Sequence, residues 1–205
     1  MAKAKAQIEL IVGLGNPGSE YAETRHNAGF WFIDRYVADL GSTFSTESRF
    51  FGDVAKVATQ GRTLRLLKPM QYMNRSGQAV AALSRYFKIP ADGILVIHDE
   101  LDLPPGDARI KFSGGHGGHN GLRDLISHLG SRDFWRVRLG IGHPGHQSEV
   151  VNYVLKTPSR DDTNAIDDAV SRVLAAMPLI AQGEMQLATN DVHSQRPKPS
   201  PPTEK

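Results

Sequence analysis

The sequence predicts a single compact α/β domain in which helices flank a central, twisted, mixed and mostly parallel sheet. Short apolar runs alternate along the chain with amphipathic stretches of helical period, which is the pattern of strands interleaved with helices. Polar motifs follow several of these runs, and open α/β sheets bind their ligands beyond the carboxyl ends of the strands. A chain of 205 residues is long enough for one domain with a full core. We therefore expect one domain over residues 1–190.

The segment 10–40 organises the rest of the chain. An apolar strand over 8–12 leads into a glycine-rich turn. A helix follows, with its apolar residues spaced as one stripe: Phe30, Ile33, Val37 and Leu40. Thr24 is a suitable N-cap, because its side-chain oxygen can accept a backbone N–H that the helix leaves unpaired. The sequence thus predicts that His26 lies in the first turn of this helix.

The next part of the chain continues the alternation. Strands are expected over 52–57 and 63–68, and Pro69 should end the second of them. A helix is expected over 77–87, because its apolar residues share one face, and Ser76 could cap it.

The second half of the chain begins with GILVIH over 93–98, an uninterrupted apolar run that is typical of a strand buried on both faces. A further strand is expected over 108–112. A helix starts near Leu122, where apolar residues recur at i, i+3, i+4 and i+7. Over 135–142 apolar residues alternate with arginines, which indicates another strand.

The last expected helix spans residues 159–181. Ser159 and Asp162 resemble a capping box, and Pro178 should kink or shorten the helix. Beyond Asn190, prolines stand among polar residues. Such a segment cannot bury enough apolar surface to order itself, so we expect 191–205 to be a disordered Pro-rich tail.

The composition excludes several classes of protein. The chain has no cysteine, which excludes disulfides and thiolate metal sites and fits a reducing cytoplasm. The first residues contain no apolar run of a signal peptide, and no stretch approaches the length of a membrane span. The formal net charge of +2 is compatible with a local nucleic-acid patch but does not demand one. We expect a cytoplasmic protein with no membrane partner.

His26 is the leading candidate for a general base. A position at a helix start disfavours imidazolium, which should keep His26 neutral and able to accept a proton. Asp99 ends a buried strand and could fix the tautomer of His26 through a hydrogen bond, although Asp102 competes for this role. A carboxylate partner raises the pKa of the histidine, so we expect a net value near the operating pH. The alternative for Asp99 is a turn residue.

Asparagines follow three of the predicted strands, at Asn16, Asn74 and Asn120. An amide side chain offers both donors and an acceptor. Three amides around one histidine could hold a carbonyl substrate and stabilise an oxyanion. A loop asparagine taken alone is more often a turn residue, so this hypothesis depends on the three converging in the fold.

A glycine motif offers a competing interpretation. Gly13, Gly15 and Gly18 match the dinucleotide fingerprint G-x-G-x-x-G after a strand. The expected helix begins too late for its N-terminus to meet a pyrophosphate, so a plain tight turn is favoured.

Four histidines form two H-x-x-H pairs: His116 with His119, and His143 with His146. Such pairs could hold zinc, but glycine loops fix ligand geometry poorly, and we expect no metal. The chain has neither a G-x-S-x-G elbow nor a cysteine nucleophile. Water activated by a base is therefore the simplest hydrolytic mechanism.

Five motifs together resemble those of the bacterial-type peptidyl-tRNA hydrolase family. They are GLGNPGSEYAETRHNAG, PMQYMNRSG, HDELDLPPG, GGHGGHNGLRDL and GIGHPG. They are spread from residue 10 to about residue 145 in one order, and the intervening segments fit in length. Several long motifs in one order are far more specific than any single motif of the chain.

The resemblance implies hydrolysis of the ester that joins a peptide to the 3′ ribose of tRNA, which recycles tRNA in translation. By motif match, His26 activates water, Asp99 orients it, and Asn16 helps to read the blocked amino end of the peptide. Other matching residues line the site for the peptide and the tRNA 3′ end: Tyr21, Tyr72, Met73, Asn74 and Asn120. The family is a compact, usually monomeric fold that needs no cofactor.

The resemblance also places the tRNA contacts. Lys111 and Arg138 match positions that grip phosphates, and such contacts position a substrate without reading its sequence. One departure is that the bacterial pattern often has a lysine shortly after GIGHPG, where this chain has His146, Gln147 and Ser148. A phosphate contact there should be weak or absent.

Two other classes of function compete with the esterase. One is a non-catalytic RNA-binding module that uses Lys111, Arg136 and Arg138, and the other is a dinucleotide oxidoreductase based on the glycine motif. The module predicts salt-sensitive tRNA binding without product, and the oxidoreductase predicts NAD(P) binding.

Overall fold

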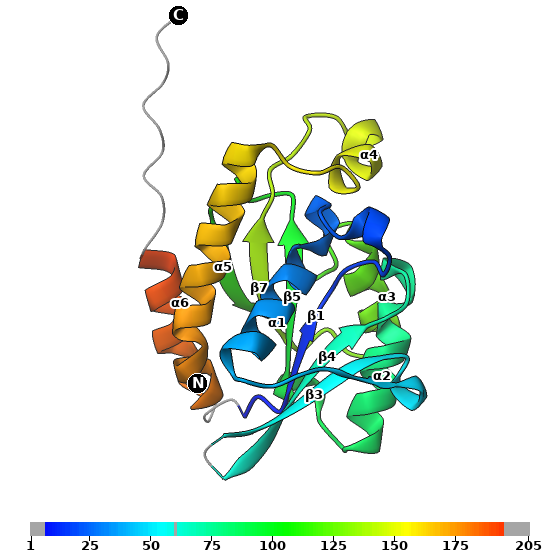
Figure 1. Ribbon diagram of the computed structural model, residues 1–205, viewed down its shortest axis with the longest axis vertical. Coiled ribbons are helices and arrows are strands. Elements are labelled where there is room, and N and C mark those ends of the chain that lie inside the picture. Colours follow the sequence, from blue (N-terminus) through cyan, green and yellow to red (C-terminus); the bar gives the residue numbers. More distant parts are fainter. Residues whose placement is uncertain (1–6, 60, 195–205) are drawn as a thin grey trace, which may run out of the picture.

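A mixed sheet forms the centre of the molecule (Figure 1). The computed structural model describes residues 7–59 and 61–194. Within these residues the sheet has seven strands in the order β2-β3-β4-β1-β5-β7-β6. Their bounds are β1 Leu10–Gly13, β2 Ser45–Glu47, β3 Gly52–Thr59, β4 Arg62–Pro69, β5 Ile94–Glu100, β6 Ala108–Phe112 and β7 Trp135–Gly140.

The four central strands, β4, β1, β5 and β7, are parallel, and the outer strands are antiparallel to their neighbours. The residues of β1 and the first four of β5 are all buried, as uninterrupted apolar runs predict. Strands are confirmed at every position where the sequence predicts one, and β2 is an additional short strand. The predicted fold class is therefore confirmed.

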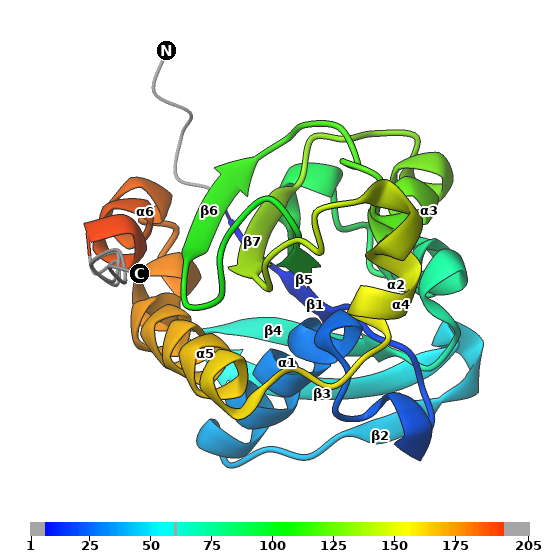
Figure 2. The same cartoon turned by 90° about the horizontal axis from the view of Figure 1, so that it is seen from above.

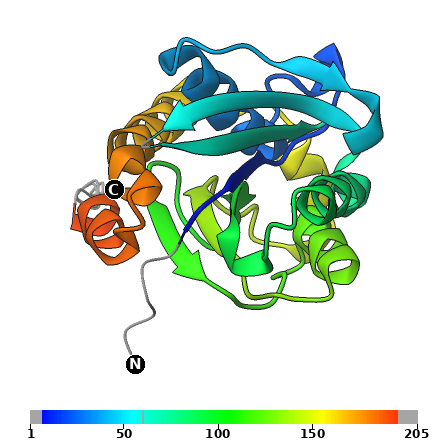
Figure 3. The same ribbon diagram turned by 90° about the horizontal axis from the view of Figure 1, so that it is seen from below.

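Helices cover both faces of the sheet (Figures 2 and 3). They are α1 Ala28–Asp39, α2 Ser76–Tyr86, α3 Asn120–Leu129, α4 Val150–Val154, α5 Arg160–Ala181 and α6 Met185–Ser194. Short 3-10 helices lie at Ser19–Tyr21, Arg25–Asn27, Ser48–Phe50, Met73–Arg75, Ala91–Gly93 and Gln147–Glu149. Among the described residues, none of the helices combines the length and apolar character needed to cross a bilayer.

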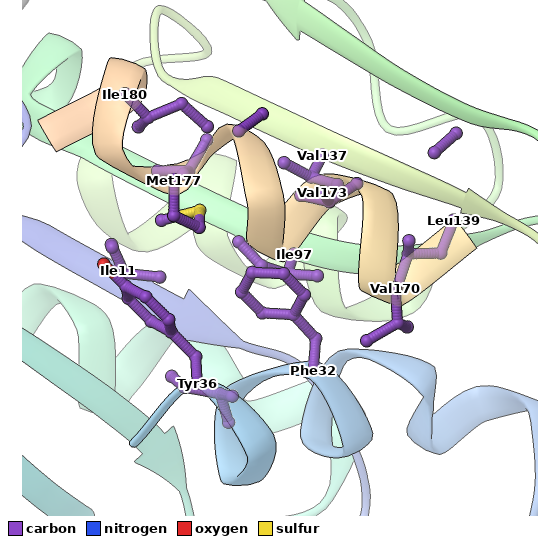
Figure 4. Close-up of a cluster of buried hydrophobic side chains, with 14 of the residues drawn as sticks. Ile11, Phe32, Tyr36, Ile97, Val137, Leu139, Val170, Val173, Met177 and Ile180 are labelled. Carbon is purple, nitrogen blue, oxygen red and sulfur yellow. The ribbon is translucent and has the colours of Figure 1, made fainter. Parts of the chain in front are cut away.

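Two hydrophobic clusters hold the layers together, one on each face of the sheet. Residues of α1, α5 and α6 form the first cluster with one face of the strands, and residues of α2 and α3 form the second with the other face. In the first cluster, Phe32 of α1 and Val173 of α5 pack over Ile97 and Val137 of the sheet (Figure 4). Because successive side chains of a strand point to opposite faces of the sheet, the strands β1, β4 and β5 each contribute to both hydrophobic clusters.

The direction in which successive strands are added to the sheet reverses at β1, and this reversal positions the site. From β1 the chain reaches β4 on one side through α1, and then β5 on the other side through α2. Such a switch point leaves a crevice beyond the carboxyl ends of the strands. The loops after β1, β4 and β5 all leave the sheet at this edge, beneath α4 (Figure 1).

Three predicted details at helix starts differ from the structure. Thr24 caps no helix, because its hydroxyl donates to the carbonyl of Tyr21 instead. Ser76 is the first residue of α2 rather than its cap, and the carboxylate of Asp124 accepts the N–H of Gly77 across 2.7 Å. The predicted cap at Ser159 is confirmed, because its hydroxyl accepts the N–H of Asp162.

Two further differences concern the C-terminal helices. Pro178 does not shorten α5, which continues to Ala181 because Met177 and Ile180 on either side of it are buried in the core. Helix α6 continues through Asn190 to Ser194, so residues 191–194 are helical and are not part of the expected tail. The rest of that expected tail, 195–205, lies outside the described residues.

Candidate active site

The end of β1 leads into a buried asparagine pair. The backbone N–H of Asn16 donates to Asn27 Oδ1 across 2.8 Å, and Asn27 Nδ2 donates back to the carbonyl of Asn16 across 2.9 Å. Asn16 Oδ1 in turn accepts the backbone N–H of Met73 across 2.7 Å. Because Oδ1 accepts this bond, the Nδ2 hydrogens of Asn16 are the natural donors to a ligand.

His26 and Asp99 form a buried pair beside these asparagines. His26 Nδ1 lies 3.0 Å from both carboxylate oxygens of Asp99, so this nitrogen carries the donated hydrogen. The Nε2 of His26 is then the atom with a free lone pair, and His26 lines the cavity described below. The alternative carboxylate, Asp102, is exposed, and its own N–H donates to Glu100. The pair is therefore His26 with Asp99.

The electrostatics of this pair differ from the sequence-based expectation. His26 lies in the 3-10 turn before α1 and not in the first turn of that helix. Burial lowers the pKa of His26, but the charge of Asp99 and the hydrogen bond to it outweigh burial and raise that pKa above the ordinary value. Burial also opposes ionisation of Asp99, but His26 and His119 outweigh it and hold the pKa of Asp99 well below its usual range. The site thus holds a carboxylate that stabilises the protonated form of its histidine.

A second histidine, His119, completes the array. Its Nδ1 accepts the backbone N–H groups of Gly121 and Leu122 at the start of α3, across 3.1 and 3.3 Å. Its Nε2 must therefore carry the hydrogen, which it donates to Asp99 Oδ1 across 3.0 Å. The H-x-x-H spacing alone marks His119 only as a candidate metal ligand. Its place just before a helix was the signal for a capping role.

The same three side chains have the composition of a metal site, since His26, Asp99 and His119 can each offer one atom within 4.8 Å of the others. The ring nitrogens that face Asp99 carry hydrogens, however, and the other nitrogen of His119 accepts backbone N–H groups. A metal ion would have to displace these bonds, so the donor set fits hydrogen bonding better than it fits a metal.

His98 supports this array from within the sheet. Its ring lies 5.1 Å from that of His119, and its Nδ1 donates to the backbone carbonyl of Asp99 across 2.6 Å. Burial is the main cause that lowers the pKa of His98 to about 3, so the ring stays neutral at physiological pH. His98 therefore adds packing but no charge to the site.

A cavity of about 290 Å³ opens above the array. One part of its wall is polar and carries His26, Asp99 and the amides of Asn16, Asn74 and Asn120. The other part is apolar and is formed by Leu101 and by valines and a leucine on and after α4: Val150, Val151, Val154 and Leu155. The three asparagines thus do converge on one space, and this space can hold a chain with both carbonyl groups and apolar side chains.

The other expected substrate contacts lie at or near this cavity. Tyr72 and Met73 line it. Tyr21 does not line it, but its ring packs edge-on against Tyr72 with centroids 6.2 Å apart. Asn120 is exposed, and its Oδ1 accepts a hydrogen bond from Arg123.

Comparison with known proteins identifies the family. A model of the family "Peptidyl-tRNA hydrolase" matches residues 10–200. The chain belongs to the peptidyl-tRNA hydrolase family. A peptidyl-tRNA hydrolase of Azoarcus sp. (strain BH72) is 55% identical over 95% of this chain and 88% of its own, and that of Aromatoleum aromaticum is 57% identical over 92% and 95%. The crystal structure of the peptidyl-tRNA hydrolase of Acinetobacter baumannii superposes with a TM-score of 0.92 at 44% identity, over 96% of this chain and all of that one.

The glycines of the first turn allow close packing, in agreement with membership of the peptidyl-tRNA hydrolase family rather than with a dinucleotide-binding protein. A Cβ on Gly13 would lie 2.4 Å from the carbonyl of Gly29, and one on Gly15 would lie 2.5 Å from the ring of Phe30. These glycines let α1 approach β1 closely, and α1 begins only at Ala28. The motif therefore serves packing rather than binding of a dinucleotide.

The basic residues of β6 and β7 lie outside the cavity lining. Lys111 is exposed, and Arg138 Nε donates to Glu100 Oε2 across 2.8 Å. Arg136 is only 4% exposed, and its guanidinium donates to two backbone carbonyls. The expectation that Arg136 belongs to an RNA-binding surface is therefore wrong, whereas Lys111 is exposed and Arg138 is half-buried.

Proposed function

We propose that the protein hydrolyses the ester between a peptide and the 3′ ribose of tRNA, with His26 as the base that activates water. The observation that carries this proposal is the His26–Asp99 pair at the polar wall of the cavity, in a chain that belongs to this family. The reaction needs one group that takes a proton from water and later returns one to the leaving alcohol. A histidine with its Nδ1 held by a carboxylate can do both at Nε2.

The proposed reaction has two steps. In the first, His26 Nε2 takes a proton from water while the water oxygen bonds to the ester carbonyl carbon, which gives a tetrahedral oxyanion and an imidazolium. Asp99 stabilises that imidazolium. In the second, the bond from carbon to the ribose oxygen breaks, and the imidazolium gives its proton to this oxygen. The products are a peptide with a free carboxyl group and a tRNA with a free 3′ hydroxyl.

We assign the peptide end of the substrate to the asparagines and the apolar wall. The amides of Asn16, Asn74 and Asn120 offer donors for peptide carbonyls and for the oxyanion. Met73 and Tyr72 cover apolar parts of the chain, with Tyr21 behind Tyr72. A free α-ammonium in this partly apolar space would lose hydration, so a peptide or blocked amino group should be preferred.

We assign the tRNA to the face beside the cavity that carries Lys111 and Arg138. Two cations can neutralise phosphates without contact to bases, which gives broad tolerance of tRNA sequence. Gln147, exposed just before α4, offers no charge for a further phosphate. The cavity is complete within one chain, which supports action as a monomer, and the substrate supports a place in the cytoplasm.

The test is hydrolysis of an N-acetyl-aminoacyl-tRNA beside the same tRNA with a free amino group, by wild type and by His26→Ala. Cleavage of the blocked substrate only, with loss of turnover in the variant, is the expected result. Full activity of His26→Ala would exclude His26 as the base. Salt-sensitive binding of tRNA by wild type without any product would favour the RNA-binding module instead.

A further inference from the structure

We propose that Arg136 is a positioning residue for the hydrolysis, which holds the loop of residues 113–118 so that His119 stays on Asp99. We call this segment the glycine loop. Arg136 Nη2 donates to the carbonyl of Gly114 across 2.5 Å, and Nη1 donates to the carbonyl of Gly115 across 2.6 Å. Hydrogen bonds from a charged donor are roughly twice as strong as neutral ones, so this is a firm attachment.

The glycine loop needs such an attachment, because it is poorly packed. Ser113, Gly114, Gly117 and Gly118 all have positive φ angles. A Cβ added at Gly115, Gly117 or Gly118 would meet nothing within 4 Å, so this stretch has no close neighbours on those sides. Glycines lose more conformational freedom than other residues when they are ordered. Ser113 is bonded to Phe134 and Asp133 at the first end of the loop, and the glycines that follow depend on Arg136.

Arg136 itself is rigidly placed. It lies on β7, which pairs on both sides with β5 and β6, and its guanidinium carbon lies 4.6 Å from the ring centroid of Phe134. Burial and the neighbouring Arg138 lower the pKa of Arg136 to about 10, so it remains charged at neutral pH. The sheet thus holds the guanidinium of Arg136 in a fixed position next to the glycine loop.

The glycine loop leads directly to His119, the second donor to Asp99. Within it, His116 Nδ1 accepts the N–H of Gly118, and the carbonyl of His116 accepts the N–H of His119. His119 then donates to Asp99, which holds His26. A shift of the loop would therefore displace His119 and change the carboxylate on which the base depends. Misplacement of this kind can cost on the order of 100-fold in rate.

The buried position of Arg136 separates this role from tRNA binding. Lys111 lies opposite Arg136 in the antiparallel pair of β6 and β7, yet Lys111 is exposed and Arg136 is only 4% exposed. A phosphate contact would change KM and the salt dependence. A positioning residue should change kcat and leave the salt dependence unchanged.

The experiment compares Arg136→Met, Arg136→Lys and the control Arg172→Met. Arg172 also donates to a backbone carbonyl, that of Gly106, but from α5, and neither residue lines the cavity. Steady-state kinetics on N-acetyl-aminoacyl-tRNA at several salt concentrations give kcat, KM and the salt slope. This arm rests on the proposed hydrolysis. Amide hydrogen exchange at Gly118 and His119 needs no substrate and tests the positioning even if the wild type cleaves nothing.

We expect kcat of Arg136→Met to fall on the order of 10- to 100-fold, with an unchanged salt slope. Exchange at the two amides should be faster by roughly tenfold or more. Arg136→Lys keeps one charged donor and should recover part of kcat, while Arg172→Met should keep the wild-type kcat. The proposal is overturned if Arg136→Met loses no more kcat than the control, or if its KM and salt slope change at constant kcat. Should Arg136→Met not fold, unchanged kcat and exchange in Arg136→Lys would overturn it equally.

Discussion

Asp99 Oδ1 lies 3.0 Å from His119 Nε2 and accepts its hydrogen, while the same oxygen lies 3.0 Å from His26 Nδ1. One carboxylate thus receives hydrogen bonds from two imidazoles. Because the other nitrogen of His119 accepts backbone N–H groups, His119 orients Asp99 through its Nε2 hydrogen. The arrangement resembles a base and its orienting acid, with one additional donor that fixes the acid.

His119→Asn separates the two functions of this side chain. Asparagine is among the best N-cap residues, so it should still accept the N–H groups that begin α3, but it is too short to reach Asp99 in the same way. We expect the free energy of unfolding to stay within about 1 kcal/mol of that of the wild type and kcat to fall roughly tenfold or more. His119→Ala is the matched variant, since it loses both contacts and should lose about 0.5–2 kcal/mol of stability in addition. Wild-type kcat in both variants would exclude an effect of His119 on Asp99.

The pH dependence of the reaction should follow His26. The base must be neutral, and its pKa is raised above 6.5, so kcat/KM should fall about tenfold per pH unit below that raised value. Asp99 does not add to this acid limb, because its pKa is held well below its usual range. The same shift acts in the opposite sense on stability: protonated His26 stabilises the fold at low pH, and this contribution is lost as the pH rises through the raised pKa.

Asp99→Asn tests the cause of this shift. The variant removes the charge that raises the pKa of His26 but leaves the burial that lowers it. The acid limb should therefore move to lower pH, while kcat falls by about 10²–10⁴ because the imidazolium loses its counter-charge. The measurements are pH–rate profiles and an NMR titration of the His26 ring. An acid limb that stays in place would show that Asp99 does not set the pKa of His26.

The elements of the fold could be predicted because they depend on local patterns. Apolar runs and helical periodicity marked the strands β1 and β3–β7 and the helices α1, α2, α3 and α5, since burial of one face is recorded in the order of residues. The partner of His26 could not be chosen between Asp99 and Asp102, because sequence spacing does not show which carboxylate points inward. His119 was missed as a partner of Asp99, since this contact joins segments 20 residues apart in the chain.

The burial of Arg136 could not be predicted from the sequence, for a different reason. Its alternation with Val137 correctly indicated a strand, but alternation cannot show that the glycine loop covers the opposite face. From the sequence, an arginine on the apparently polar face of this strand is therefore expected to be a surface cation. Likewise, the apolar residues of α6 are few, so the sequence does not predict this helix, and the expected tail includes residues 191–194, which are helical.

Residues 191–194 should contribute to stability. Val192 is 2% exposed, and His193 Nε2 accepts the N–H of Ile110, which belongs to the edge strand β6. We expect truncation after Asn190 to lower the free energy of unfolding by roughly 2–4 kcal/mol relative to truncation after Ser194, because it removes one buried aliphatic side chain and the acceptor of that N–H. Denaturant unfolding of the two truncated chains measures the difference. Equal stability would show that the last turn of α6 is dispensable.

Gln147 offers a test of how the tRNA is held. If phosphates pass near the start of α4, Gln147→Lys should lower KM at low salt and steepen the dependence of log KM on log salt by about 0.7–0.9. Lys111→Ala should do the opposite, raising KM and reducing that slope by a similar amount, because it removes one phosphate contact. Gln182→Lys adds the same charge beyond the end of α5, where the cavity described above does not reach, and serves as the control. If the two added lysines act alike, the effect reflects net charge rather than a phosphate near Gln147. A slope that Lys111→Ala leaves unchanged would remove Lys111 from the proposed tRNA contacts.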